Sequence, residues 1–134
     1  MRGRIVSGVR EAVIFLTVLG GFASDSDAGS SRGQSVEIDA AIDTGFTGHL
    51  TLPASLATEV LTLPARGFVE VELADGSATT LNVYEARVLW HGRPRRIPVY
   101  ETEGAPLVGM SLLRGSRLTM EIMEGGAVEI EELL

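Results

Sequence analysis

The sequence predicts an all-β fold in one domain that spans residues 1–134. Segments rich in β-branched and aromatic residues recur along the chain, and few segments have the composition of a helix. An Asp-Gly pair also stands between two stretches of alternating apolar residues, which is typical of a β-hairpin. Because 45% of the residues are apolar, the chain can bury a core and is not expected to be disordered.

The first third of the chain contains three expected strands: Ile5–Val6, Ala12–Leu19 and Val36–Ile42. Ser7-Gly8 separates the first two, and a polar connection, Ser24–Ser35, separates the second from the third.

The second of these segments allows two interpretations. An apolar run over residues 12–23 follows several arginines, which is also the outline of a secretory leader. The run is shorter than the roughly 20 residues that a membrane span needs. Glu11 at its edge and its β-branched content favour a buried strand. A small secreted β-protein with a cleaved leader remains the alternative.

A short helix and a hairpin are expected in the middle of the chain. Pro53–Val60 starts with a proline suited to a first helical turn, and Pro64 and Gly67 are expected to end the helix. Strands Phe68–Leu73 and Thr79–Trp90 then flank the turn Ala74-Asp75-Gly76-Ser77. We expect this hairpin to project from the body.

The last third continues the pattern of short strands and tight turns. The expected elements are a turn at His91-Gly92, a strand over 95–100, an apolar segment over 106–109, a short helix over 111–114, and strands over 117–123 and 127–131 around Glu124-Gly-Gly126.

Charge and composition exclude several functions. The net charge of −7 argues against binding nucleic acid, which needs a basic face. With no cysteine, and with His49 and His91 far apart, neither a zinc site nor a cysteine nucleophile is expected. Asp25 and Asp27 lack the further ligands of a calcium loop. We also expect a cytoplasmic protein without metal or organic cofactor, and no contact with a membrane.

Other side chains receive ordinary structural interpretations. We expect a solvated turn at the basic cluster of Arg93, Arg95 and Arg96. We expect the side chain of His49 to lie on the surface or to be half-buried. Large aromatic side chains on the hairpin arms predict core packing; these are Phe68, Tyr84 and Trp90.

The candidate chemistry lies at the end of the third strand, in Asp43-Thr44-Gly45. In one interpretation Asp43 caps a turn and Gly45 supplies a positive φ angle. In the other, the acid after a hydrophobic strand belongs to a site, because an unpaired buried charge is costly and needs a partner.

Two ordered motifs and the hairpin favour the second interpretation. Residues 36–53, with Asp43-Thr44-Gly45 at their centre, resemble the active-site strand of retropepsin-like aspartic proteases of the prokaryotic clan AA group. Pro106–Leu113 resembles the segment that lies beside the catalytic loop in that family, and residues 69–84 fall where the family has its flap. The resemblance covers nearly the whole chain and implies a closed β-barrel or sandwich with one lobe per chain.

The resemblance also implies a function, an aspartic endopeptidase that hydrolyses a polypeptide substrate. Such chemistry needs two carboxylates that share a proton, and this chain has one Asp-Thr-Gly motif, so the site would be completed by a homodimer. Asp43 would be general base in one subunit and general acid in the other, with Thr44 bonding across the twofold axis and Gly45 facing the substrate. Gly109 would permit close approach behind the loop.

The flap tip and the chain ends complete what the resemblance implies. Ala74, Asp75 and Gly76 would cover a bound peptide. The family's terminal strands help to join the subunits, which favours an inward position for Val128 and Ile130.

This sequence departs from the viral enzymes at several positions. It has Phe46-Thr47-Gly48 where they carry an alanine and two acids, and Met110 where they carry an arginine that pairs with one acid. The absence of both partners of this ion pair is internally consistent, because removing only one of them would leave the other charge unpaired. The flap also lacks their multiple glycines. The alternative is therefore a catalytically silent dimerisation or peptide-binding module on the same fold.

Overall fold

The fold is described from a computed structural model, which covers residues 1–6, 11–20 and 35–134. The expected Ser7-Gly8 turn, Asp25, Asp27 and most of the predicted Ser24–Ser35 connection lie outside the described residues.

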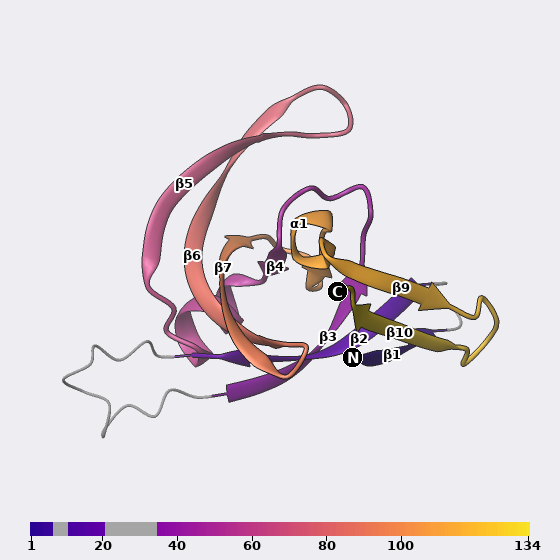
Figure 1. Ribbon diagram of the computed structural model, residues 1–134. Coiled ribbons are helices and arrows are strands. Elements are labelled where there is room, and N and C mark those ends of the chain that lie inside the picture. The colour runs from indigo at the N-terminus through magenta and orange to yellow at the C-terminus, as the bar shows by residue number, and fades with distance from the viewer. Residues whose placement is uncertain (7–10, 21–34) are drawn as a thin grey trace, which may run out of the picture.

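The described residues form ten strands and two short helices (Figure 1). In chain order they are β1 (Arg2–Val6), β2 (Glu11–Leu19), β3 (Ser35–Ile42), β4 (Leu50–Leu52), η2 (Ser55–Val60), β5 (Ala65–Glu72), β6 (Ala78–Trp90), β7 (Arg93–Glu101), β8 (Leu107–Val108), α1 (Met110–Leu113), β9 (Ser116–Met120) and β10 (Ala127–Glu132). The predicted all-β class is therefore confirmed.

All ten strands belong to one sheet, in the order β5-β6-β7-β4-β8-β3-β2-β1-β10-β9, and β2 also pairs with β6. Two neighbouring pairs are parallel, β3 with β8 and β4 with β7, and the other pairs are antiparallel. Because β3 lies between β2 and β8, the strand that leads to Asp43 is held on both sides.

The core gathers the inward side chains of the central strands. The largest fully buried side chains are Ile14, Leu16, Val18, Leu50, Leu52, Leu61, Val88, Ile97, Val99, Val108, Leu112 and Ile130. Their period-two spacing along β2, β6 and β7 places them on one face of each strand. Val128 and Ile130 are buried as predicted, and so are Tyr84 and Trp90.

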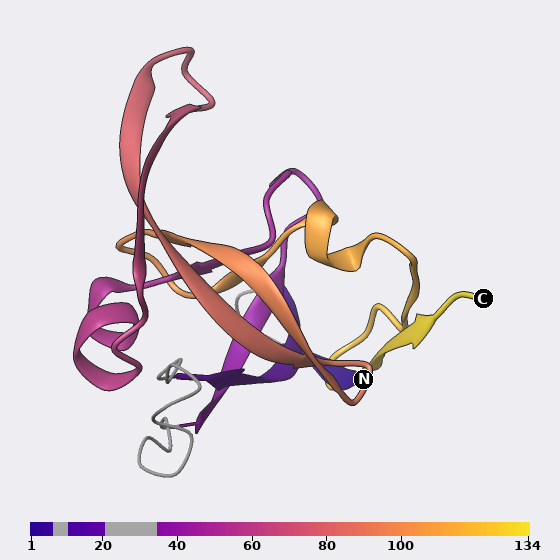
Figure 2. The ribbon, with the colours of Figure 1, turned by 60° about the vertical axis from the view of Figure 1, so that its left-hand side comes forward.

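The β5–β6 hairpin leaves the body, as expected. Figures 1 and 2 both show it rising on the side where the loop after β3 also lies. Along β6 the side chains become regularly buried only from Tyr84 onward, so its first half belongs to the projecting arm. At the turn the Gly76 N–H donates to the Leu73 carbonyl at 2.9 Å, and Gly76 has a φ of +87°.

Several predictions were wrong in detail. Phe68 is 76% exposed rather than in the core, because it lies on the projecting arm. The three arginines expected in a solvated turn lie on β7, where Arg93 pairs with Glu132 and Arg96 with Glu85. The helix predicted over Pro53–Val60 is confirmed as η2, which ends at Val60, with the Leu61 N–H donating to the Leu56 carbonyl at its end.

The strand predicted over 117–123 also ends early. β9 stops at Met120, because Met123 donates to the Glu121 carbonyl at 2.9 Å and turns the chain there. Ile122 and Met123 consequently lie in the turn that leads to β10 and not in a strand. No helix within residues 1–6, 11–20 and 35–134 is long and apolar enough to cross a membrane.

Candidate active site

Asp43 is the first residue after β3, and hydrogen bonds fix its backbone. Its N–H donates to the Val108 carbonyl at 2.9 Å, which extends the parallel β3–β8 ladder by one residue. Its carbonyl accepts from the Phe46 N–H at 3.1 Å and closes a tight turn. The buried strand β3 therefore places Asp43 at the start of an ordered loop.

The carboxylate of Asp43 is half-buried and turns back onto its own loop. Its Oδ1 accepts a hydrogen bond from the Gly45 N–H at 2.9 Å. Gly45 does not have the positive φ of the turn-cap interpretation. Its requirement is spatial, because a Cβ there would lie 3.3 Å from Asp43 Oδ1. Thr44, between them, is exposed to solvent in the single chain.

The segment that begins with Gly109 lies directly behind this loop. A Cβ on Gly109 would lie 2.4 Å from the Gly48 carbonyl oxygen and 2.7 Å from that of Phe46. The first turn of α1 then bonds to the same loop, with Met110 N–H donating to the Phe46 carbonyl at 2.8 Å and Ser111 N–H to the Gly48 carbonyl at 3.1 Å. Only glycine leaves room for this approach.

Phe46, which stands at the position of the viral alanine, packs against a neighbouring ring. The Phe46 ring meets the Tyr100 ring edge to face, with centroids 6.0 Å apart. A Cβ on Gly48 would lie 2.5 Å from the tip of Phe46, so the glycine makes room for the ring. Met110 is half exposed at the position of the viral arginine. Of the two positions at which the viral enzymes carry acids, Gly48 makes room for the Phe46 ring and Thr47 is exposed.

The titratable groups around the loop are few. His49 closes the loop, and its carbonyl accepts the Gly109 N–H at 3.0 Å. Burial lowers the pKa of His49 below its usual value, and the positive charge of Arg95 lowers it further. Its predicted half-buried position is confirmed.

The predicted site residues fall into two places. Asp43, Thr44, Gly45 and Gly109 come together around one loop, whereas Ala74, Asp75 and Gly76 occupy the tip of the β5–β6 hairpin. At that tip Asp75 Oδ1 accepts from the Ser77 hydroxyl at 2.5 Å and from the Ser77 N–H at 2.9 Å. These bonds lower the pKa of Asp75, so its charge stabilises the turn.

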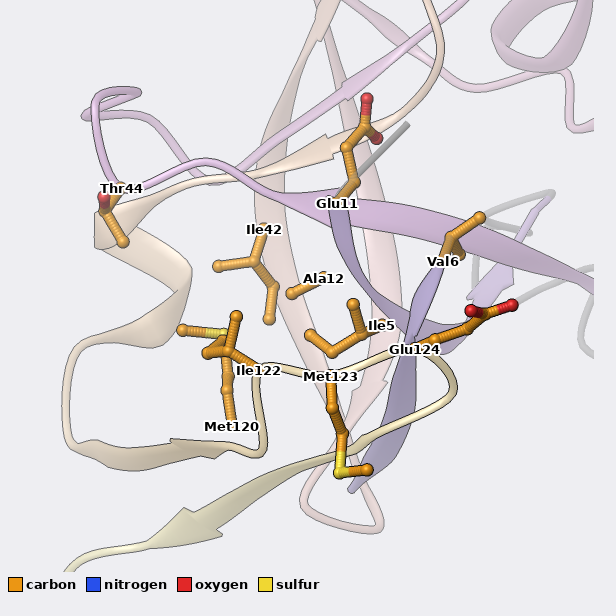
Figure 3. A pocket seen from close by; sticks show the side chains of 10 residues that line it. All are labelled: Ile5, Val6, Glu11, Ala12, Ile42, Thr44, Met120, Ile122, Met123 and Glu124. Carbon is orange, nitrogen blue, oxygen red and sulfur yellow. The ribbon is translucent and has the colours of Figure 1, made fainter. Parts of the chain in front are cut away.

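One feature beside the site was not predicted. An apolar cavity of about 550 Å³ borders Thr44 (Figure 3). Its lining residues come from β1, β2, the end of β3 and the β9–β10 turn: Ile5, Val6, Glu11, Ala12, Ile42, Thr44, Met120, Ile122, Met123 and Glu124. The sequence did contain a signal for this cavity, the adjacent apolar pair Ile122-Met123 within an acidic turn. The prediction of a strand over 117–123 obscured this signal.

In the part of the chain that the structure describes, no group of three or more histidine, aspartate or glutamate side chains could hold a metal ion. The polar groups that the structure places at the Asp43 loop are the Asp43 carboxylate, the Thr44 hydroxyl and backbone amides.

Comparison with known proteins identifies the fold. The chain is similar to the crystal structure of a retropepsin-like aspartic protease from Rickettsia conorii, with a TM-score of 0.53 and 17% sequence identity. The similarity covers 99% of this chain and 96% of that chain. No protein-family model and no curated protein matches the sequence.

The class that the fold defines is therefore retropepsin-like. At 17% identity the likeness concerns the course of the chain, and the chemistry has to be argued from the residues around Asp43.

Proposed function

We propose that this protein is an aspartic endopeptidase that acts as a homodimer, with Asp43 of each copy as a catalytic residue. The observation that carries the proposal is the ordered Asp43 loop, which is bonded to β8 and supported from behind by the Gly109 segment. A turn cap on the surface would not need a second, distant segment in van der Waals contact with its backbone.

The reaction needs two carboxylates with one proton between them. The ionised Asp43 would take a proton from a water molecule, which attacks the peptide carbonyl carbon, while the protonated Asp43 of the other copy donates to the carbonyl oxygen. The amine leaves after it receives a proton from the pair. Because the two acids interact strongly, they would titrate as one unit with two macroscopic pKa values.

One copy supplies a single acid, so the second must come from a twofold partner. The exposure of Thr44 beside Asp43 supports this arrangement, because its hydroxyl is available to bond across the axis. The β5–β6 hairpin would cover an extended polypeptide and add backbone hydrogen bonds to it.

Asp43→Asn tests the assignment. We expect cleavage of a peptide library at mildly acidic pH to fall by about 10³-fold or more, because the amide can neither take nor give the proton. Asp39→Asn is the matched control, since Asp39 is exposed on the same strand and should leave activity unchanged. Equal activity in Asp43→Asn and the wild type would refute the assignment.

The same assay examines the second candidate, a silent dimerisation or peptide-binding module. The absence of the viral charges at residues 46–48 and 110 favours this candidate, because those charges anchor the substrate backbone in the viral enzymes that the sequence resembles. A wild-type protein that dimerises and binds peptides but never cleaves them would establish the module and exclude the protease.

A further inference from the structure

The cavity beside Thr44 is a continuation of the core that no residue among 1–6, 11–20 and 35–134 covers. Met120 pairs directly with Val128 across the β9–β10 ladder, so both side chains lie on the same face of the sheet. Val128 is fully buried, whereas Met120 is 38% exposed. A core-facing position is thus left open to solvent at this end of the molecule.

The turn after Met120 adds two large apolar side chains to this opening. Ile122 is 75% exposed and Met123 is 65% exposed. The turn itself is ordered, because the Ile5 N–H donates to the Gly126 carbonyl at 2.9 Å and the Gly126 N–H donates to the Met123 carbonyl at 2.8 Å. Two adjacent apolar side chains held outward in this way are typical of a contact surface.

The polar groups of the cavity lie at its rim. Figure 3 shows Ile5, Ala12, Ile42 and Ile122 pointing toward one another, while the carboxylates of Glu11 and Glu124 point away from them. An apolar centre with a polar rim is the anatomy of a protein–protein interface.

The pairing of the terminal strands limits where a second copy can bind. β1 and β10 pair with each other within one chain, with Gly3 opposite Val128, and β1 also pairs with β2. Both strands are therefore hydrogen-bonded on both sides, and β9 ends the sheet. Exchange of terminal strands between subunits would have to break this intrachain ladder.

We propose that a second copy of this chain covers the cavity, with the Ile122-Met123 turns of the two copies packed against each other. The inference rests on the proposed function, since a protease with one acid per chain is incomplete without that copy. Thr44 belongs both to the catalytic motif and to the cavity wall, so a twofold contact here also brings the Asp43 loops together. A surface with both a hollow and projecting apolar side chains can pair with its own copy.

Sedimentation equilibrium of the double variant Ile122→Asp/Met123→Asp tests the surface. We expect the dissociation constant of the dimer to rise roughly 100-fold, because four charges would enter an apolar contact. Phe68→Asp is the control, since Phe68 is 76% exposed, as Ile122 is at 75%, but lies on the hairpin arm. It should dimerise like the wild type. Unchanged dimerisation of a folded double variant would overturn the inference, as would a wild type that is monomeric at every concentration.

A second measurement needs no disruptive substitution. The chain has no cysteine, so Ile122→Cys and Phe68→Cys each carry one thiol. At concentrations that favour the dimer, Ile122→Cys should react with Ellman's reagent about tenfold more slowly than Phe68→Cys, and dilution should remove the difference. Equal rates at all concentrations would overturn the inference. A dimer protected at Ile122 that cleaves no peptide would instead refute the proposed function alone.

Discussion

The Asp43 loop and the β5–β6 hairpin both connect strands, yet the protein holds them in opposite ways. The loop over 43–49 bonds to β8 and α1 and has no room for a Cβ at Gly48 or Gly109. The tip of the hairpin bonds to itself, and a Cβ on Gly76 would meet nothing within 4 Å. The glycines of the loop are needed for space, and the glycine of the tip is needed for its φ angle.

This difference matches the two tasks of the proposed enzyme. A catalytic carboxylate has to be held close to its productive geometry, which requires packing on all sides. A cover over the substrate has to open and close, so its contacts with the body must be few. Substitutions at the glycines of the two regions are the most direct test of this difference between a tightly packed loop and a free hairpin tip.

The largest stability effect is expected for Gly109→Ala. The added methyl group would lie 2.4 Å from the Gly48 carbonyl oxygen, so the loop or α1 must shift, at a cost of about 3 kcal/mol. Urea unfolding measures this cost, and peptide cleavage should fall with it because the Asp43 loop moves. Gly104→Ala is the control: a Cβ there meets nothing within 4 Å, so its stability should stay within about 0.5 kcal/mol of the wild type. Similar stabilities of the two variants would contradict the packing argument.

A smaller effect is expected for Gly76→Ala. Its cost is conformational, about 1 kcal/mol, because the φ of +87° is unfavourable for alanine while the space is open. We expect kcat/KM for a peptide to fall only a few-fold, with the free energy of unfolding lowered by about 1 kcal/mol. A loss of stability as large as that of Gly109→Ala would show that the hairpin tip is part of the rigid body.

The smallest effect concerns pH. The folded protein has a lowered pKa at His49, so as the pH falls below about 6.5 the unfolded chain binds the proton first and stability declines. His49→Gln should reduce this decline between about pH 6.5 and 5, and the remainder comes from His91, whose pKa burial also lowers. The lowered pKa values of Asp75 and Glu132 act at lower pH, since carboxylates titrate near 4. A decline that is unchanged in His49→Gln would exclude burial of this side chain as its cause.

Local sequence signals predicted most of the strands and the hairpin. Alternating side chains marked β6, and the Asp75-Gly76 pair marked its turn, because both depend on residues close in the chain. The grouping of Asp43 with Gly109 followed from the resemblance of two motifs, and the structure gives it a physical reason in the contact between their backbones.

Features that depend on tertiary contacts were not predictable in this way. Phe68 is exposed because its strand leaves the body, and residue type alone does not carry that information. The turn that ends β9 is bonded to Ile5, which is more than 110 residues away, so the sequence around Met120 alone did not indicate it. The cavity beside Thr44 combines side chains from both ends of the chain, so the local signal of Ile122-Met123 could not locate it alone.

The most direct test of the central claim mixes wild-type protein with Asp43→Asn under conditions of exchange between dimers. If catalysis needs one carboxylate from each copy, a threefold excess of the variant should lower the activity per wild-type chain to about a quarter, because that fraction of wild-type chains keeps a wild-type partner. Activity per wild-type chain that does not change on mixing would contradict a site shared between two copies.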